Sequence, residues 1–444
     1  MSSLHGDTIV AAGTPSGISA LALVRVSGPG SLDLLRRHFP SAPVPPEPRR
    51  AYYGWFVDGA GNRLDDGVAV FWRGPRSYTG EDVVEFSCHG NPLIVDRVMA
   101  ALIGSGARLA RPGEFTQRAF ENGKLDLTQA EAVMDLISAQ SDRALRMAGR
   151  ARAGSLSRAV AGLQQRLLNH LAHVEAFIDF PDEDLSPEVG ESLKAGLEEI
   201  VAECRKLLAT AREGRLLRQG AVVVLAGAPN AGKSSLLNAL LQESRAIVSP
   251  EPGTTRDTID AVVVWEGIPV RLVDTAGLRE SADLVEREGV ERSRAAVAGA
   301  DVVIWVEDGR MEGSLNLGEI PEGVPVIRCR TRADLAEYVS GEGLAISSVS
   351  GTGLPELRRA LMEALCVNGD GGEALVALNR RQEEVVRRAT EQIEAGLREL
   401  AEGLPPELVA TSLRGAQQAF GELVGMQSCE DVLDRLFESF CIGK

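Results

Sequence analysis

The sequence contains no long apolar segment and no excess of positive charge. No uninterrupted run of apolar residues is longer than six, so we expect no membrane-spanning segment in the 444 residues. Lys and Arg number 47, whereas Asp and Glu number 63, which gives a net charge of −16. Proteins that bind nucleic acid by themselves are usually basic, so we expect only a local patch or a partner protein to hold nucleic acid here.

Closely spaced cysteines are also missing. There is no CxxC pair and no Cys/His cluster, which argues against a disulfide framework and against a structural zinc site. The first seven residues lack the charged and apolar regions of a signal peptide. Together these absences predict a cytoplasmic protein. The six cysteines are Cys88, Cys204, Cys329, Cys366, Cys429 and Cys441.

The residues that are present predict several folded domains. Hydrophobic residues make up 44% of the chain and charged residues 25%, a balance typical of globular proteins. Residues 1–118 show mixed patterns, residues 119–216 and 368–444 are helical, and strands alternate with helices at residues 217–367. The predicted fold class is α/β plus α: an N-terminal α+β domain and a helical domain with an inserted Ras-like P-loop α/β domain. Expected strands are residues 18–26, 67–72, 82–87, 221–226, 260–265, 270–273, 302–306 and 324–329. A long helix is expected around residues 163–178, and another helical stretch at residues 191–215.

A phosphate-binding loop is the most specific short motif in the chain. The segment from Gly227 to Ser234, GAPNAGKS, matches G-x-x-x-x-G-K-[ST], follows an expected strand and opens an expected helix. Its backbone N–H groups and the helix N-terminus are expected to face phosphate groups. Lys233 is expected to bridge the β- and γ-phosphates, and Ser234 to ligate Mg²⁺. The alternative, a glycine turn without a ligand, does not account for the strand and helix on either side.

Later segments follow in the order that a GTPase requires. Asp274 in DTAG is placed to hold Mg²⁺ through water, and Thr255 in GTTRD is the expected second Mg²⁺ ligand. TRAD at residues 331–334 stands where translation-factor-related GTPases, which these segments resemble, have Asn-Lys-x-Asp. Asp334 can accept two hydrogen bonds from guanine, and adenine cannot donate in this way. Thr331 lacks the amide that ties this loop to the phosphate loop, so we expect guanine specificity to be retained and nucleotide affinity to be weakened.

The usual residues for GTP hydrolysis are missing. Leu278 stands where Ras-like proteins have a Gln that orients water, and all five histidines precede the P-loop domain. No arginine finger can be assigned, and oxygens of Asn230 and of residues 249–254 can hold a monovalent cation instead. Four acids that can orient water follow, although most are expected to be solvated charges: Glu280, Asp283, Glu286 and Glu288.

With these motifs, the chain resembles the MnmE (TrmE) family of tRNA-modifying GTPases. The resemblance covers the whole chain and rests on DTIVA, RPGEFTQRAF, KLDLTQAEA, DTAGLRE and the terminal FCIGK. It implies an N-terminal domain that binds folate and dimerises, and G domains that pair across the homodimer with potassium in the place of an arginine finger. The family acts with the FAD-dependent protein MnmG (GidA), in a heterotetramer or larger assembly.

The resemblance further implies a reaction on certain tRNAs. A carboxymethylaminomethyl group, which is aminomethyl-type, would be added to C5 of the wobble uridine. A tetrahydrofolate derivative, 5-formyl or 5,10-methylene, would supply the one-carbon unit, and GTP, Mg²⁺ and K⁺ would be the other cofactors.

The resemblance also assigns roles to single residues. Glu286 would orient water and act with Lys233 in catalysis. The potassium ligands would be Asn230, Ser249, Glu251 and Thr254. The folate contacts would be Arg25, Glu85, Lys124 and Lys444, with Cys441 nearby. A carboxylate suits a pterin and a cation suits a folate tail, but without the resemblance these residues are equally well surface charges, and Cys441 a buried structural cysteine. All expected nucleotide contacts are Asn230, Ala231, Gly232, Lys233, Ser234, Ser235, Ser249, Pro250, Glu251, Pro252, Gly253, Thr254, Thr255, Asp274, Thr275, Ala276, Gly277, Thr331, Arg332, Ala333, Asp334, Ser347, Ser348 and Val349.

A basic segment is visible without the resemblance. Between Ser141 and His170 there are six arginines and one aspartate. Three of these arginines share a helical face that can contact tRNA phosphates, and a solvated helix face is the alternative. The three are Arg143, Arg146 and Arg150.

Two other classes of function remain open. One is a GTPase that acts only as a binding switch, in signalling or ribosome assembly, although FCIGK and the long N-terminal region argue against it. The other is a folate enzyme of one-carbon metabolism with a regulatory G domain.

Overall fold

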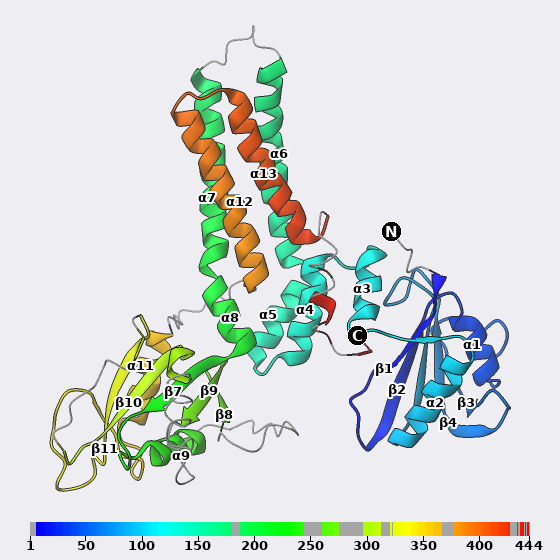
Figure 1. Ribbon diagram of the computed structural model, residues 1–444, viewed down its shortest axis with the longest axis horizontal. Coiled ribbons are helices and arrows are strands. Elements are labelled where there is room, and N and C mark those ends of the chain that lie inside the picture. Colours follow the sequence, from blue (N-terminus) through cyan, green and yellow to red (C-terminus); the bar gives the residue numbers. More distant parts are fainter. Residues whose placement is uncertain are drawn as a thin grey trace, which may run out of the picture. The chain divides into compact units, whose positions relative to one another are not determined.

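The computed structural model describes most of the chain in two compact units (Figure 1). One unit contains residues 1–134, 152–184 and 399–444, and the other contains residues 135–151 and 185–398. Among the described residues, no helix is long and apolar enough to cross a membrane. The described residues are 6–179, 187–243, 260–274, 296–311, 320–321, 323–365, 377–426, 433, 436–438, 440 and 442–443, and the side chains of residues 187–189, 243, 260 and 261 lie outside the description.

The first unit begins with a six-stranded sheet, here called the N-terminal sheet, in the order β3-β4-β5-β2-β1-β6. Its neighbours are antiparallel except for β1 and β6, which are parallel. The predicted strands 18–26, 67–72 and 82–87 are confirmed as β2, β4 and β5, which differ from them at the ends. The strands are β1 (Ile9–Ala12), β2 (Ser19–Ser27), β3 (Ala51–Val57), β4 (Arg63–Trp72), β5 (Val83–Gly90) and β6 (Arg108–Leu109).

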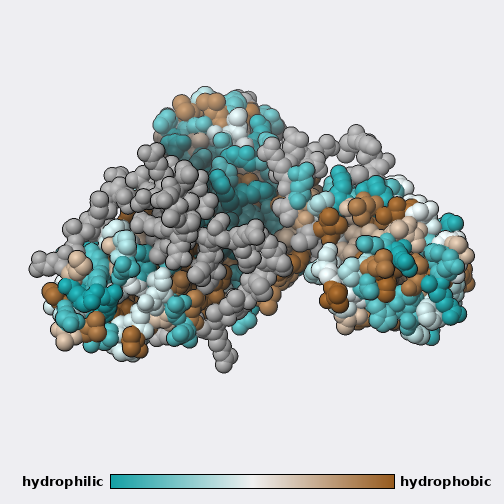
Figure 2. Space-filling model, turned by 60° about the horizontal axis from the view of Figure 1, so that its bottom comes forward, coloured by the Kyte–Doolittle hydropathy of each residue, from teal (hydrophilic) through white to brown (hydrophobic). Residues whose placement is uncertain are grey.

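Two helices cover one face of the N-terminal sheet. In α1 (Ser31–His38) and α2 (Pro92–Gly104), Leu35 and Leu102 are buried in the same core as Phe86 of β5. On the opposite face of the sheet, Ile9 and Ala11 of β1 are buried against Phe115 of α3, and several other strand positions on that face are exposed or half-buried. On the side of the sheet domain seen in Figure 2, hydrophobic and hydrophilic residues are interspersed.

Helices complete the first unit. They are α3 (Glu114–Glu121), most of α4 (Leu127–Ser138), α6 (Ser155–Asp179) and α13 (Pro406–Val424). The buried face of α6 carries Leu163, Leu167 and Leu171 at helical spacing, and α13 runs along α6 (Figure 1). Arg414 of α13 donates to Glu175 of α6 across their exposed side.

The second unit contains a six-stranded sheet, here called the P-loop sheet, in the order β12-β11-β10-β7-β9-β8. All its neighbouring strands are parallel except β8 and β9. Its central strand reads AVVVLA and is buried on both faces, as the continuous apolar run predicts. The strands are β7 (Ala221–Ala226), β8 (Asp260–Trp265), β9 (Ile268–Asp274), β10 (Val302–Asp308), β11 (Val326–Thr331) and β12 (Leu344–Ala345).

One helical stretch of this unit contains a break. The helical stretch expected at residues 191–215 is confirmed, and it consists of two helices that meet at Thr210. The hydroxyl of Thr210 donates to the carbonyl of Leu207 at 2.6 Å, so the side chain satisfies a backbone acceptor at the break. The helices are most of α5 (Asp142–Arg152), α7 (Pro187–Ala209), α8 (Ala211–Gln219), α9 (Lys233–Glu243), α11 (Leu354–Ala364) and most of α12 (Arg380–Ala401).

Candidate functional site

The loop between β7 and α9 has the shape that the phosphate-loop motif predicts. Gly227 has a φ of +144°, and a Cβ there would lie 2.1 Å from the carbonyl oxygen of Val306, so only glycine fits. Asn230 adopts the left-handed conformation with a φ of 61°, which asparagine tolerates better than most residues. A loop of this shape between a strand and a helix N-terminus can present backbone N–H groups to an anion.

Lys233 reaches back over this loop. Its side chain is buried, and Nζ donates to the carbonyl oxygens of Gly227 at 2.9 Å and Ala228 at 2.8 Å. The ammonium group is therefore held at the loop, where it can neutralise phosphate charge.

A pair of oxygens lies beside the loop. Ser234 Oγ donates to Asp274 Oδ2 at 2.6 Å, because parallel pairing of β7 with β9 brings the ends of both strands to the same edge. A hydroxyl and a carboxylate are oxygen ligands of the kind that Mg²⁺ prefers, so these two residues fit the ion that the sequence predicts.

The expectation that Thr331 leaves its loop untied is wrong. Thr331 is buried. Its hydroxyl donates to the carbonyl of Ala231 in the phosphate loop at 2.7 Å, and it also contacts the carbonyl of Glu307 in β10 at 3.1 Å. Arg332 adds a second tie, because Nη2 donates to the carbonyl of Asn230 at 3.1 Å. A threonine hydroxyl therefore replaces the missing amide, which the residue type alone did not predict.

The two segments expected to contact the base lie side by side. The N–H of Ala333 donates to the carbonyl of Ile346, which precedes Ser347. Ser347 is buried, and its hydroxyl accepts from the N–H groups of Val349 and Ser350. Asp334, the last residue of the segment 331–334, is exposed. The hydrogen bonds thus bring residues 331–334 to residues 347–349, as a guanine site would need.

A second group of polar residues lies on the N-terminal sheet. Arg25 of β2 and Glu85 of β5 are register partners, and their side chains form an ion pair with N–O distances of 2.8 and 2.9 Å. Trp72 Nε1 donates to the other oxygen of Glu85 at 3.1 Å. The Arg25 guanidinium lies 5.5 Å from the centre of the Tyr78 ring and 5.7 Å from that of Phe115.

The end of the chain meets this group. Arg25 Nη1 donates to the carbonyl of Gly443 at 3.4 Å, and a Cβ on Gly443 would lie 2.3 Å from the carbonyl oxygen of Ala12. Lys124, which is exposed, donates to the carbonyl of Pro75 at 2.9 Å, three residues before Tyr78. Arg25 and Glu85 are thus in direct contact, and Lys124 binds the loop that carries Tyr78.

The sequence prediction missed Trp72 and Tyr78. Trp72 ends a predicted strand, but nothing in its local sequence indicates that it faces Glu85 across β4 and β5. Several predicted site residues lie outside the described residues: Ser249, Pro250, Glu251, Pro252, Gly253, Thr254, Thr255, Thr275, Ala276, Gly277, Glu286, Cys441 and Lys444.

Comparisons with known proteins cover the whole chain. A family model described as the MnmE helical domain matches residues 127–441, and one described as the GTP-binding protein TrmE N-terminus matches residues 8–124. The tRNA modification GTPase MnmE of Aquifex aeolicus is 42% identical over 448 residues, with 99% of this chain and all of that protein covered. The protein of the same name from Thermus thermophilus is 44% identical, with 99% of both chains covered.

The chain belongs to the MnmE family of tRNA modification GTPases. It is therefore a GTPase, and the loop at Lys233 with its oxygen pair is the candidate site for its nucleotide. Among solved structures, the G domain of the Thermotoga maritima FeoB iron transporter is similar over 32% of this chain and 98% of that chain, with 28% identity and a TM-score of 0.25.

Proposed function

We propose that this GTPase modifies the wobble uridine of certain tRNAs at C5, with a tetrahydrofolate derivative as the source of the one-carbon unit. In this proposal it works as a cytoplasmic homodimer, with the G domain inserted in the helical domain and with MnmG as partner. The product would be a carboxymethylaminomethyl-type uridine. The observation that carries the proposal is the Arg25–Glu85 pair of the N-terminal sheet.

That pair has the chemistry of a folate site. The Glu85 carboxylate can accept hydrogen bonds from the N–H groups of a pterin, and a cation farther away, such as Lys124, can bind the glutamate tail at the other end of the folate. The rings of Tyr78 and Phe115 flank the guanidinium; Phe115 is buried, whereas the half-buried Tyr78 ring can supply apolar surface for a flat heterocycle. The contact of Gly443 with Arg25 supports a place for the end of the chain in the proposed site, and Lys444 is a proposed folate contact there.

The proposed hydrolysis uses the oxygen pair together with residues outside the described part of the chain. Ser234 and Asp274, with Thr255, would hold Mg²⁺, which would neutralise phosphate charge. Glu286 would orient the attacking water, because Leu278 has no polar atom with which to do so. The proposed potassium ligands are Asn230, Ser249, Glu251 and Thr254.

Nucleoside analysis of tRNA tests the proposed function most directly. Cells that lack this protein should lose the modified wobble uridine, and the wild-type gene should restore it. A chain without residues 442–444 should hydrolyse GTP at nearly the wild-type rate and fail to restore the nucleoside, because only the folate site is damaged. Unchanged nucleosides in the deletion strain would contradict the proposal and favour a GTPase that acts as a binding switch.

A further inference from the structure

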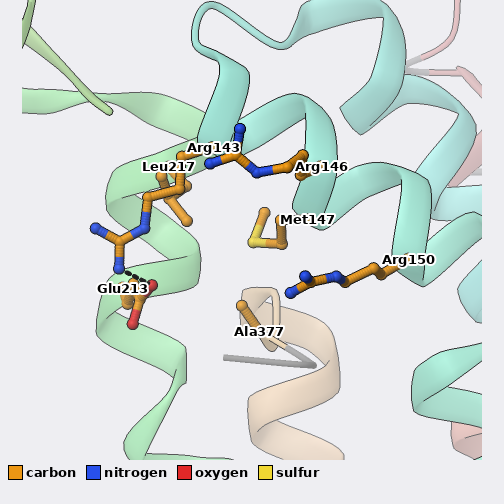
Figure 3. Close-up of a pocket in the computed structure, with 7 residues that line it drawn as sticks. All are labelled: Arg143, Arg146, Met147, Arg150, Glu213, Leu217 and Ala377. Carbon is orange, nitrogen blue, oxygen red and sulfur yellow. Dashed lines mark hydrogen bonds and ion pairs between the residues drawn. The ribbon is translucent and has the colours of Figure 1, made fainter. Parts of the chain in front are cut away.

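Three arginines of α5 form a row beside a shallow hollow of the second unit (Figure 3). Arg143, Arg146 and Arg150 project on the side of the helix that carries Met147. Residues of α8 and the segment before α12 form the rest of the lining: Glu213, Leu217 and Ala377. We call Arg143, Arg146 and Arg150 the arginine row.

The start of α5 is fixed to the P-loop sheet, so the arginine row is held in place. Ser141 Oγ donates to the carbonyl of Gly267 in the turn between β8 and β9, and it accepts from the N–H of Ala144. Arg143 donates to Glu213 of α8 and packs on the same turn, since a Cβ on Gly267 would lie 2.8 Å from the Arg143 Cβ. A ligand that binds the row therefore does not need to order the helix first.

The charge of this region is opposite to that of the whole chain. Helix α5 carries four arginines and one aspartate, and the hollow is lined by three arginines and one glutamate, in a protein of net charge −16. The spacings of three and four residues place successive arginines about 4.5 and 6 Å apart along the helix axis. A planar guanidinium binds phosphate oxygens in a bidentate manner, which suits a row of phosphates.

The size of the hollow limits what can bind. Its volume is about 10 Å³, which is room for a single water molecule and not for a base or a sugar. A ligand must therefore lie across the row on the surface, as a polymer backbone does. Of the polymers that carry repeated phosphates, the one that this family acts on is tRNA.

We propose that the arginine row binds the phosphate backbone of the tRNA substrate. This rests on the proposed function, in which tRNA is modified. Phosphate contacts fix the position of a nucleic acid without reading its sequence, so the row would act on all the tRNAs that the protein modifies.

Filter binding of an unmodified tRNA transcript to the full-length protein, at a series of KCl concentrations, tests the proposal. The double variant Arg146→Gln/Arg150→Gln should bind roughly tenfold more weakly for each arginine removed. The slope of log affinity against log salt should fall by about one for each lost phosphate contact. Arg146→Lys/Arg150→Lys should keep most of the slope, because the charge is retained.

The matched control is Arg387→Gln/Arg398→Gln, which removes the same charge from two exposed positions of α12. Thermal unfolding and GTP hydrolysis, measured on every variant, show that the folds are intact. Wild-type affinity and slope in the Arg146/Arg150 variant, or an equal loss in the control, would overturn the inference. So would failure of the wild type to bind tRNA at low salt.

The two proposals fail in distinguishable ways. If tRNA binding is unchanged in the Arg146/Arg150 variant and the modified nucleoside is lost, the row serves an acidic protein partner, and the tRNA inference is wrong while the proposed function stands. If the deletion strain keeps its nucleosides, the proposed function fails, whatever the row binds.

Discussion

The two sheets of this protein build their sites in different ways. In the P-loop sheet, Asp274 ends strand β9 and Ser234 lies in the first turn of α9, after the loop that follows β7, so each belongs to a short continuous motif. In the N-terminal sheet, Arg25 and Glu85 meet face to face on neighbouring antiparallel strands, 60 residues apart in sequence. The first site can therefore be recognised from local sequence, whereas the second exists only because of strand register.

This difference between the two sheets also predicts that nucleotide binding and folate binding can be disrupted independently. Each site has its own sheet and its own supporting contacts, Thr331 for the phosphate loop and Trp72 for the Arg25–Glu85 pair. A substitution in one site should therefore leave binding at the other site close to normal.

The largest expected effect concerns hydrolysis. Glu286→Ala should lower kcat by about two orders of magnitude or more, with GTP affinity little changed, because a group that positions water acts mainly in the transition state. The measurement is steady-state GTP hydrolysis with Glu280→Ala and Glu288→Ala as controls. Normal turnover of Glu286→Ala would move the role to another acid of the same loop.

The same assay tests whether potassium activates GTP hydrolysis. Replacing Na⁺ by K⁺ at constant ionic strength should raise the rate strongly, which excludes simple screening. Asn230→Gly should remove the difference between the salts, since glycine keeps the left-handed backbone and deletes only the amide side chain. Equal wild-type rates in both salts would refute the potassium assignment.

The second-largest expected effect concerns folate binding at the N-terminal sheet. Glu85→Gln keeps the shape of the side chain and removes the charge that pairs with Arg25, so binding of a tetrahydrofolate derivative should weaken by about tenfold or more. GTP hydrolysis should be unchanged. Isothermal titration with 5-formyltetrahydrofolate measures the loss, and Glu47→Gln, an exposed acid of the same domain, is the control. A parallel fall in GTP hydrolysis would show that the two sites are not separable.

The sequence predicted the parts of the fold that depend on local pattern. Strand β7 and the phosphate loop lie at the predicted residues, since an apolar run and a glycine motif are properties of adjacent positions. The break at Thr210 and the tie from Thr331 were not predicted, because a hydroxyl can bond wherever the fold places an acceptor. The contact of Trp72 with Glu85 depends on the register of β4 and β5, and no local sequence motif predicts that register.

A smaller effect is expected at Thr331. Thr331→Val removes the donor to the carbonyls of Ala231 and Glu307 and leaves buried acceptors with one partner fewer. GDP affinity should fall by roughly 5- to 30-fold, the equivalent of about 1–2 kcal/mol. Thr331→Ser keeps the hydroxyl and should bind nearly as the wild type does. Titration with fluorescent GDP measures the affinity of each variant. An unchanged GDP affinity in Thr331→Val would mean that Arg332 alone holds the loop.

The smallest expected effect is the acid sensitivity of the N-terminal sheet domain. Burial alone would raise the pKa of Asp7, but hydrogen bonds from Arg108 and Arg118, at 2.7 and 2.6 Å, lower it below its ordinary value of 3.8. Burial would also raise the pKa of Glu114, but hydrogen bonds from Arg108 and from the N–H of Arg111, together with the charges of Arg108 and Arg118, lower it. Carboxyls with a lowered pKa stabilise the fold above their unfolded pKa, and this contribution is lost as the pH falls through the folded pKa.

Asp7→Asn tests this contribution, because asparagine fills the same space without the charge. Its urea midpoint should lie below that of the wild type at pH 7, and the difference should shrink as the pH falls from about 4, the ordinary pKa, through the lower pKa of folded Asp7, below which the wild-type carboxyl is protonated as well. Hydrogen exchange resolved by peptide should place the loss in residues 6–121 and leave the P-loop sheet protected as before. A difference in midpoint that stays constant down to acid pH would contradict this. It would show that Asp7 contributes through shape and hydrogen bonding alone, and that its charge does not stabilise the N-terminal sheet domain.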